Sequence, residues 1–332
     1  MRRKTIIRCG FESDHAPAGN GLQSSSLKPF MTFRCSPAVL LLFALTASSQ
    51  TSSPIHQTAP AKSPAASHAS QNATEPNGSA NALVKSTIQN EVNAIDNDHT
   101  HWMYQSQTRK NGVMLTEEVV ETTHGNLERV IARNGQPLSP DEQKQADQKA
   151  QKFVNDIAAQ QKQRGDLDAD GKKSKEMLKM LPDALIFTYA GHEGNRTKLT
   201  FKPNPDFHPP SREAKVFAAM EGQMVINTKE HRLVEFSGHL MRPVKFGGGL
   251  LGDLDAGGSF DVRQQEAGPG HWEISLLKVN IKGKALLFKT INEQQDERDS
   301  HFKRVPNNLT LAQAYDLAIK QQAPSGKTQS GD

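Results

Sequence analysis

The feature that most constrains the fold is a succession of short runs, over residues 184–295, in which apolar and polar residues alternate. Glycine, proline, asparagine and aspartate separate the runs. Regularly spaced short strands joined by such turns are typical of an antiparallel meander. The runs read ALIFTYAG, KLTFKP, GQMVINT, HRLVEFSGHL, GSFDVRQQ, HWEISLLKVNI and KALLFKTINEQQ. We therefore expect the second half of the chain to form a mainly antiparallel sheet.

Further strands are predicted ahead of this meander. The segments HWMYQSQTRK and VMLTEEVVET flank Asn111 and Gly112, a pair that favours a two-residue hairpin turn because both positions need positive φ. A third strand is expected over residues 127–131, closed by another Asn-Gly pair. Before these strands, apolar residues recur at helical spacing over residues 83–95, which predicts a short amphipathic helix.

A helical insertion over residues 139–181 is expected to interrupt the strands. Ser139, Pro140 and Glu142 form a strong helix start, with a capping serine, a proline in the first turn and a capping-box glutamate. The first helix is predicted to end near residue 163, and an acidic turn is predicted to separate it from a short second helix.

The end of the folded part is also marked by a helix signal. Thr310 and Gln313 form another capping box before an apolar stripe. Because strands lie on both sides of the insertion, we expect a single domain over residues 83–323. Its predicted class is α+β, mainly antiparallel β. The polar residues 324–332 are predicted to form a disordered tail.

The N-terminal part has the plan of a secretory signal. Residues 31–50 combine Arg34, an apolar core over residues 38–45 and a small-residue cleavage site at residues 47–49. The residues before Met31 resemble an upstream extension, so both Met1 and Met31 remain candidate start codons. We expect residues 1–49 to be extension and signal, and the protein to be periplasmic or secreted; the alternative is a cytosolic tail with a chance apolar run.

Both cysteines belong to this leader. Cys9 and Cys35 precede the proposed cut, so the exported protein would contain no thiol that could mispair in an oxidising compartment. Residues 50–82 are rich in serine, alanine, proline and threonine. Such a segment lacks the apolar residues needed to offset chain entropy, which predicts a disordered spacer.

Charge and hydropathy exclude two classes of protein. Residues 1–50 hold six of the 40 basic and two of the 36 acidic residues, which leaves 34 of each in residues 51–332. The basic balance of the whole chain is therefore no argument for a nucleic-acid partner. No apolar stretch reaches the roughly 18 residues of a membrane span, so we expect no integral membrane protein.

Two motif-like segments lack the context that their chemistry needs. Asp166, Asp168 and Asp170 resemble the start of a calcium loop, but the twelfth position is Met177 rather than a bidentate glutamate. The glycines of GGGLLG, over residues 247–252, fit G-x-G-x-x-G, yet β-like residues follow where a dinucleotide site needs a helix. We interpret the two segments as a solvated acidic turn and a loop, and we expect no cofactor.

Asp96, Asp98, His99 and His101 form a compact acidic–histidine cluster that could hold a metal ion. His99 and His101 share a face if they lie on a strand, and His124 is a possible third ligand, but two histidines alone leave a site short of ligands. We therefore expect no metal ion and interpret the cluster as the polar start of a strand. No G-x-S-x-G elbow is present, and we predict no catalytic residue and no enzyme.

The remaining signal is a set of large apolar side chains on the predicted strands. Such residues usually form a core, but a curved sheet with helices over it can instead enclose an apolar cavity. The candidate cavity residues are Trp102, Tyr104, Phe187, Tyr189, Phe201, Met224, Ile226, Phe236, Trp272 and Ile274.

The segment EGQMVINTKEHRLVEFSGHL resembles a glycine–strand–turn–strand hairpin of the outer-membrane lipoprotein-sorting family, the Lol-type periplasmic carriers. HWEISLLKVNIKGKALLFKT resembles the meander that follows, and HWMYQSQTRKNGVMLTEEVVETTHGNLERVI the opening strands. Other blocks, such as VKFGGGLLGDLDAGGSF, are similar to uncharacterised exported bacterial proteins. The resemblance covers residues 85–305 and implies a curved, incomplete β-barrel with covering helices and an apolar cavity for acyl chains. The helix over 139–163, the proline-rich 203–210 and the glycine-rich 247–258 depart from that family.

These observations predict a non-catalytic exported protein that binds a lipid or an acylated ligand in an apolar cavity. The alternative is an envelope protein-interaction or sensor module with a filled β core. A metal-dependent hydrolase that uses the histidines near residue 100 is the third hypothesis.

Overall fold

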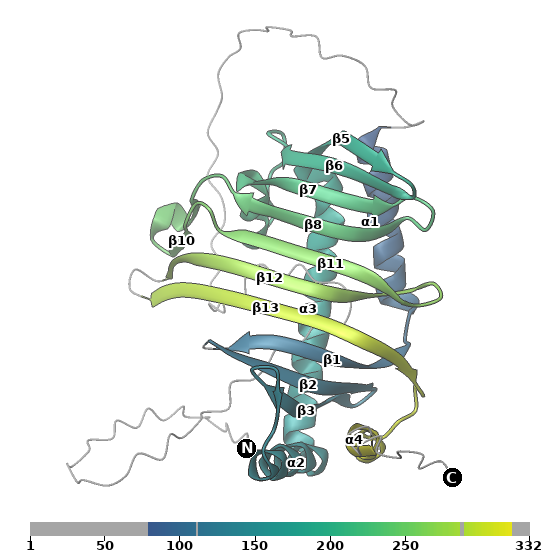
Figure 1. Cartoon of the computed structure of the whole chain (residues 1–332). Helices are drawn as coiled ribbons and strands as arrows, with labels where there is room; N and C mark the ends of the chain where they lie inside the picture. Colours follow the sequence, from purple (N-terminus) through teal and green to yellow (C-terminus); the bar gives the residue numbers. More distant parts are fainter. Residues whose placement is uncertain (1–78, 111, 286–288, 321–332) are drawn as a thin grey trace, which may run out of the picture. The chain divides into compact units, whose positions relative to one another are not determined.

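The computed structural model describes residues 79–110, 112–285 and 289–320. The predicted leader, most of the predicted spacer and the C-terminal tail lie outside these residues. The described strands form one long antiparallel sheet that does not close on itself (Figure 1). The expected α+β class with a mainly antiparallel, curved sheet and covering helices is confirmed.

Most strands follow one another along a single path. From one edge to the other they are β4 (Gln136–Pro137), β3 (Gly125–Arg133), β2 (Val113–Thr122), β1 (His101–Lys110), β13 (Lys289–Val305), β12 (His271–Ala285), β11 (Ser259–Gly268), β8 (Arg232–Leu240), β7 (Met220–Asn227), β6 (Arg196–Pro203) and β5 (Leu185–Glu193). A short ribbon of β9 (Val244–Phe246) and β10 (Gly252–Leu254) joins the sheet through the end of β12.

Helices cover both faces of this sheet. The main apolar core lies between strands β5–β8 and β9–β12 and the helices α1 (Ala80–Asn97) and α3 (Ile157–Ala184), together with the short 3-10 helix η1 (Glu213–Ala219). A second apolar cluster joins β1–β3 to α2 (Pro140–Asn155) and α4 (Leu311–Lys320). Different helices therefore cover opposite faces of the sheet toward its two ends.

Helix α3 bridges the sheet from one end to the other, behind the strands in Figure 1. Its 28 residues span about 42 Å at 1.5 Å per residue. The nine steps from β3 to β5 cover about 43 Å at an inter-strand spacing of about 4.8 Å. Near one end Gln163 bonds the backbone of Asn126 through both its amide atoms, at 2.8 and 3.1 Å, and the other end packs on α1 and β5.

The acidic segment of residues 166–170 is not the predicted turn. It lies inside α3, which also differs from the predicted pair of helices because its break comes at Asp156 instead of near residue 163. The Asp156 side chain accepts from Ala159 N at 3.0 Å and starts the second helix. Since both ends of α3 are held, the intervening glycines stay helical despite a cost of about 1 kcal/mol each.

The strand predicted over residues 284–295 is also displaced. Lys284 and Ala285 end β12, residues 286–288 lie outside the described part, and β13 continues to Val305. Its later residues are mostly polar and so give no alternating signal. Backbone pairing with β12 on one side and β1 on the other holds them in the sheet.

Candidate ligand-binding site

The ten predicted cavity residues divide among three places. Trp102 and Tyr104 form a separate cluster on β1 with Val119 and Phe302. Trp272 is buried at the start of β12. The other seven belong to the main core or pack against it: Phe187, Phe201, Met224, Ile226 and Phe236 are at most 5% exposed, and Tyr189 and Ile274 lie partly buried at its margin.

Aromatic rings cross the main core from strand to strand. The ring of Phe201 lies 5.9 Å from that of Phe187 and 5.0 Å from that of Phe236, and Phe236 lies 5.1 Å from Phe260. A Cβ at Gly222 would stand 2.8 Å from the Phe201 ring and closer still to the backbone of β8. This part of the predicted cavity is packed side chain against side chain.

Strand β1 presents a different surface. Trp102, Tyr104, Ser106 and Thr108 alternate along it and therefore share one face. Ser106 is fully buried and Thr108 is 6% exposed, yet neither hydroxyl has a hydrogen-bond partner. Buried polar groups are nearly always bonded, so two adjacent unbonded hydroxyls are an unusual feature of this face.

The strand register places these hydroxyls on the side of the main core. Thr108 pairs with Glu297 of β13, and Glu297 pairs with Leu277 of β12. Directly paired residues in a ladder project to the same side, and Leu277 belongs to the core cluster under α1 and α3. Met103, which alternates with the four residues, packs with the cluster of α2 and α4 on the opposite face.

A buried ion pair fixes α1 on this side of the sheet. Arg232 of β8 donates from Nε and Nη2 to the two carboxylate oxygens of Glu91, at 2.9 and 3.1 Å. Glu91 is 2% exposed and also accepts from Leu233 N at 2.7 Å and Gln264 Nε2 at 3.4 Å. Several bonds to both oxygens offset the cost of taking a carboxylate out of water.

The pair continues into an aromatic contact. The guanidinium of Arg232 lies 5.9 Å from the centre of the Trp272 ring, within the range of a cation–π interaction. Trp272 Nε1 donates to Glu230 at 2.8 Å. The predicted cavity residue Trp272 therefore serves the polar attachment of α1 rather than the apolar core.

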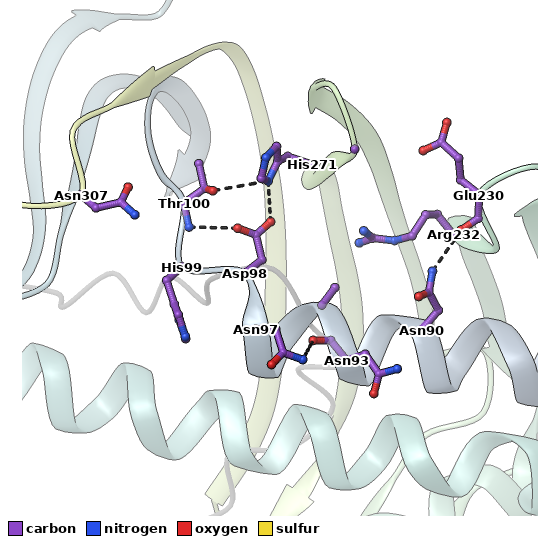
Figure 2. A pocket seen from close by; sticks show the side chains of 12 residues that line it. Asn90, Asn93, Asn97, Asp98, His99, Thr100, Glu230, Arg232, His271 and Asn307 are labelled. Atoms are coloured by element: carbon purple, nitrogen blue, oxygen red, sulfur yellow. Dashed lines mark hydrogen bonds and ion pairs between the residues drawn. The ribbon is translucent and has the colours of Figure 1, made fainter.

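An open pocket of about 770 Å³ lies at the C-terminal end of α1. It is walled by α1, the turns before β8 and β12 and the segment after β13, and its lining is mostly polar (Figure 2). The lining side chains that Figure 2 labels are Asn90, Asn93, Asn97, Asp98, His99, Thr100, Glu230, Arg232, His271 and Asn307.

An aspartate–histidine pair lies on one wall of this pocket. Asp98 Oδ2 is 2.7 Å from His271 Nδ1, and its other oxygen accepts from Thr100 N at 2.9 Å. Burial raises the pKa of Asp98, but the bonds from His271 and Thr100 together outweigh burial and lower it. The carboxylate therefore orients the histidine ring, whose centre lies 5.9 Å from that of the Trp102 ring, with the two ring planes at 67° to each other.

Behind this wall lies a carboxyl group that is protonated at neutral pH. Burial, together with the nearby charges of Glu121 and Asp98, raises the pKa of Glu273 to about 9, and Arg232 and Trp102 only partly oppose this. The Trp102 indole nitrogen is itself buried and makes no hydrogen bond of normal geometry, although it is near enough to favour the charged form of Glu273.

The three histidines considered as metal ligands do not form one site. His99 lines the pocket, His101 begins β1 and His124 lies in the turn after β2. No group of three or more metal-ligating side chains occurs within the described ranges. After the GGGLLG segment, the chain enters β10 rather than a helix. None of the described helices is both long and apolar enough to cross a membrane.

Sequence reasoning did not single out Glu91, Arg232 or Glu273. Glu91 could have been noticed, because it stands seven residues after Val84 on the apolar stripe of its helix, where a charge needs a buried partner. Arg232 and Glu273 carry no such signal, since their surroundings come from distant strands. No protein-family model, curated protein or solved structure matches this chain.

Proposed function

We propose that this protein is an exported, non-catalytic binding protein that holds a lipid or an acylated ligand between its sheet and the helices α1 and α3. The observation that carries the proposal is the pair of buried, unbonded hydroxyls of Ser106 and Thr108 beside the aromatic side chains of Trp102 and Tyr104. The polar group of such a ligand would form hydrogen bonds with the two hydroxyls, and its apolar chain would cover the two aromatic side chains.

The placement of the helices supports this proposal. The main packing of α3 is with α1, η1 and β5 at one end and with α2 and β3 at the other. Strand β1, which carries both Ser106 and Thr108, lies between these two ends in the sheet order. The resemblance of the sequence to the Lol-type carriers agrees with the same role, because in those carriers an apolar cavity takes acyl chains.

The first experiment is chemical analysis of the protein as isolated. The chain is exported in a bacterial host and purified without detergent, and a solvent extract is analysed by mass spectrometry. We expect a lipid or an acylated molecule in near-stoichiometric amount. A protein that carries none, and that takes up none when incubated with a total lipid extract, would contradict the proposal.

A second function is favoured by the packed part of the core. Phe187, Phe201 and Phe236 fill the layer under α1 and α3, as expected of an interaction or sensor module of the envelope. Such a module would be recovered free of lipid and bound to one defined envelope protein after crosslinking in cells. The two outcomes separate the two functions.

A further inference from the structure

Half of the exposed large apolar side chains in the described part lie in one short segment of the chain. Six large apolar residues of the described part are exposed, and three of them, Met241, Leu250 and Leu251, lie within residues 241–251. Leu250 is 65% exposed. Scattered apolar residues need no explanation, but a group of them on one surface indicates an interaction site.

Leu250 and Leu251 lie on a tight loop whose conformation depends on three glycines. The loop joins β9 to β10 through the short 3-10 helix η2 (Gly247–Gly249), and all three of its glycines have positive φ, at 56°, 68° and 97°. Leu250 N donates to Gly247 O and Leu251 N to Phe246 O, each at 3.1 Å. A Cβ at Gly247 would lie 2.7 Å from Leu251 Cγ, so the glycines let the loop close while Leu250 faces solvent.

The corner of the sheet that carries this loop also holds basic side chains. Lys245 of β9 and Lys284 of β12 both pair with Asp253 of β10 and therefore project to the same side. Lys282 is exposed two residues before Lys284, and Arg242 is exposed just before β9. The neighbouring acids are Asp253, the exposed Asp255 and the exposed Glu293, which pairs with Ile281 beside Lys282. The four positive charges therefore outnumber the three negative ones locally, although residues 51–332 are neutral overall.

We propose that this corner, beside β10 in Figure 1, docks the protein on the surface of an anionic bilayer. Leu250 and Leu251 enter the interface between headgroups and acyl chains, and the lysines lie against anionic headgroups. A bilayer fits better than a protein partner, because a stable protein interface buries roughly 1,000 Å² or more, whereas the exposed apolar side chains on this loop are the two leucines.

Docking does not depend on the ligand-holding function proposed above. A protein with a completely filled core would use the same corner to reach a membrane, and a carrier without membrane affinity would still retain its ligand. The two proposals therefore fail separately.

The test is co-sedimentation of the purified chain with vesicles of equal parts phosphatidylglycerol and phosphatidylcholine, compared with phosphatidylcholine alone. We expect binding to the anionic vesicles and little to the neutral ones. The double variant Leu250→Ser/Leu251→Ser should lose at least a hundredfold in partitioning, the order of magnitude that the removal of two buried leucines implies. Lys245→Gln/Lys284→Gln should weaken binding about fivefold per lysine.

The matched control is Ile157→Ser, which removes an exposed apolar side chain at the start of α3 and should leave vesicle binding unchanged. The variant Leu250→Trp gives a second readout, because its fluorescence should shift to the blue with anionic vesicles, whereas the native Trp102 and Trp272 are buried. Absence of binding by the unaltered chain, or equal loss in Ile157→Ser, would overturn the proposal.

Discussion

Arg232 of β8 donates two hydrogen bonds to Glu91 of α1, and the side chains of Arg232 and Glu91 are 9% and 2% exposed, respectively. The pair connects residues that are 141 positions apart in the chain. It determines how α1 sits on the sheet, because a shift of the helix by one turn would leave both charges buried and unpaired.

Removal of one partner should therefore be costly. Glu91→Ala leaves Arg232 buried without its counter-charge and should lower the free energy of unfolding by about 3–5 kcal/mol, measured by urea denaturation. The double variant Glu91→Leu/Arg232→Met should recover much of this loss. Lys162→Ala, which breaks the exposed pair with Asp166, is the control and should cost less than about 1 kcal/mol. Equal losses in Glu91→Ala and Lys162→Ala would show that the buried pair does not fix α1.

The buried carboxyl of Glu273 predicts a pH dependence. Its pKa is about 9 in the folded protein against 4.5 in its ordinary state, so between these values the folded protein keeps a proton that the unfolded chain has lost. Its contribution to stability is therefore complete below about pH 4.5 and is lost as pH rises through 9. Glu273→Gln should be more stable than the unaltered protein at pH 8, with a flatter profile from pH 5 to 9. Coinciding profiles of the two proteins in thermal unfolding would refute the assignment.

The continuity of α3 can be tested at its glycines. A Cβ at Gly165 or Gly171 would meet no atom within 4 Å, and glycine inside a helix is worse than alanine by about 0.5–1 kcal/mol. Gly165→Ala and Gly171→Ala should each stabilise the protein by that amount in chemical denaturation. Destabilisation by Gly171→Ala would indicate that residues 166–171 form a turn after all.

Close packing at the aromatic core predicts an opposite effect for another glycine. A Cβ at Gly222 would stand 2.0 Å from Ser237 O and 2.6 Å from Gly238 Cα, both backbone atoms that cannot move without breaking the β7–β8 ladder. Gly222→Ala should cost about 1–3 kcal/mol. Gly191→Ala on β5, where nothing lies within 4 Å, is the control and should be neutral in the same thermal unfolding experiment.

The sequence correctly predicts helix starts and hairpins, because these depend on residues that are close together in the chain. The capping box at Ser139 is present, with Ser139 N bonded to Glu142 at 3.0 Å, and the hairpin of β1 and β2 has its predicted bounds. The helix over residues 166–171 could not be predicted in the same way. Its glycines and aspartates favour a turn locally, and only contacts at both ends of α3 override that preference.

The site was harder to predict than the fold. The apolar strand residues were correctly placed on strands, but whether such residues line a cavity or fill a core depends on how the helices lie over them. The polar features at this site combine residues from distant parts of the chain. Ser106 is buried by elements that are distant in the sequence. Glu273 owes its raised pKa first to burial and then to the charges of Glu121 and Asp98, which come from other elements.

The central claim, that a lipid or an acylated ligand binds against the inner face of β1, is tested most directly by ligand-dependent thermal stability. The lipid-stripped chain, Ser106→Ala/Thr108→Val and the control Ser86→Ala, which removes an exposed hydroxyl, are each unfolded with and without a palmitoylated peptide. We predict that the ligand raises the thermal midpoint of the unaltered chain and the control and has little effect on the double variant. At a hundredfold excess over Kd, binding should add about 2.7 kcal/mol to the free energy of unfolding. Equal stabilisation of all three proteins, or of none, would contradict the account.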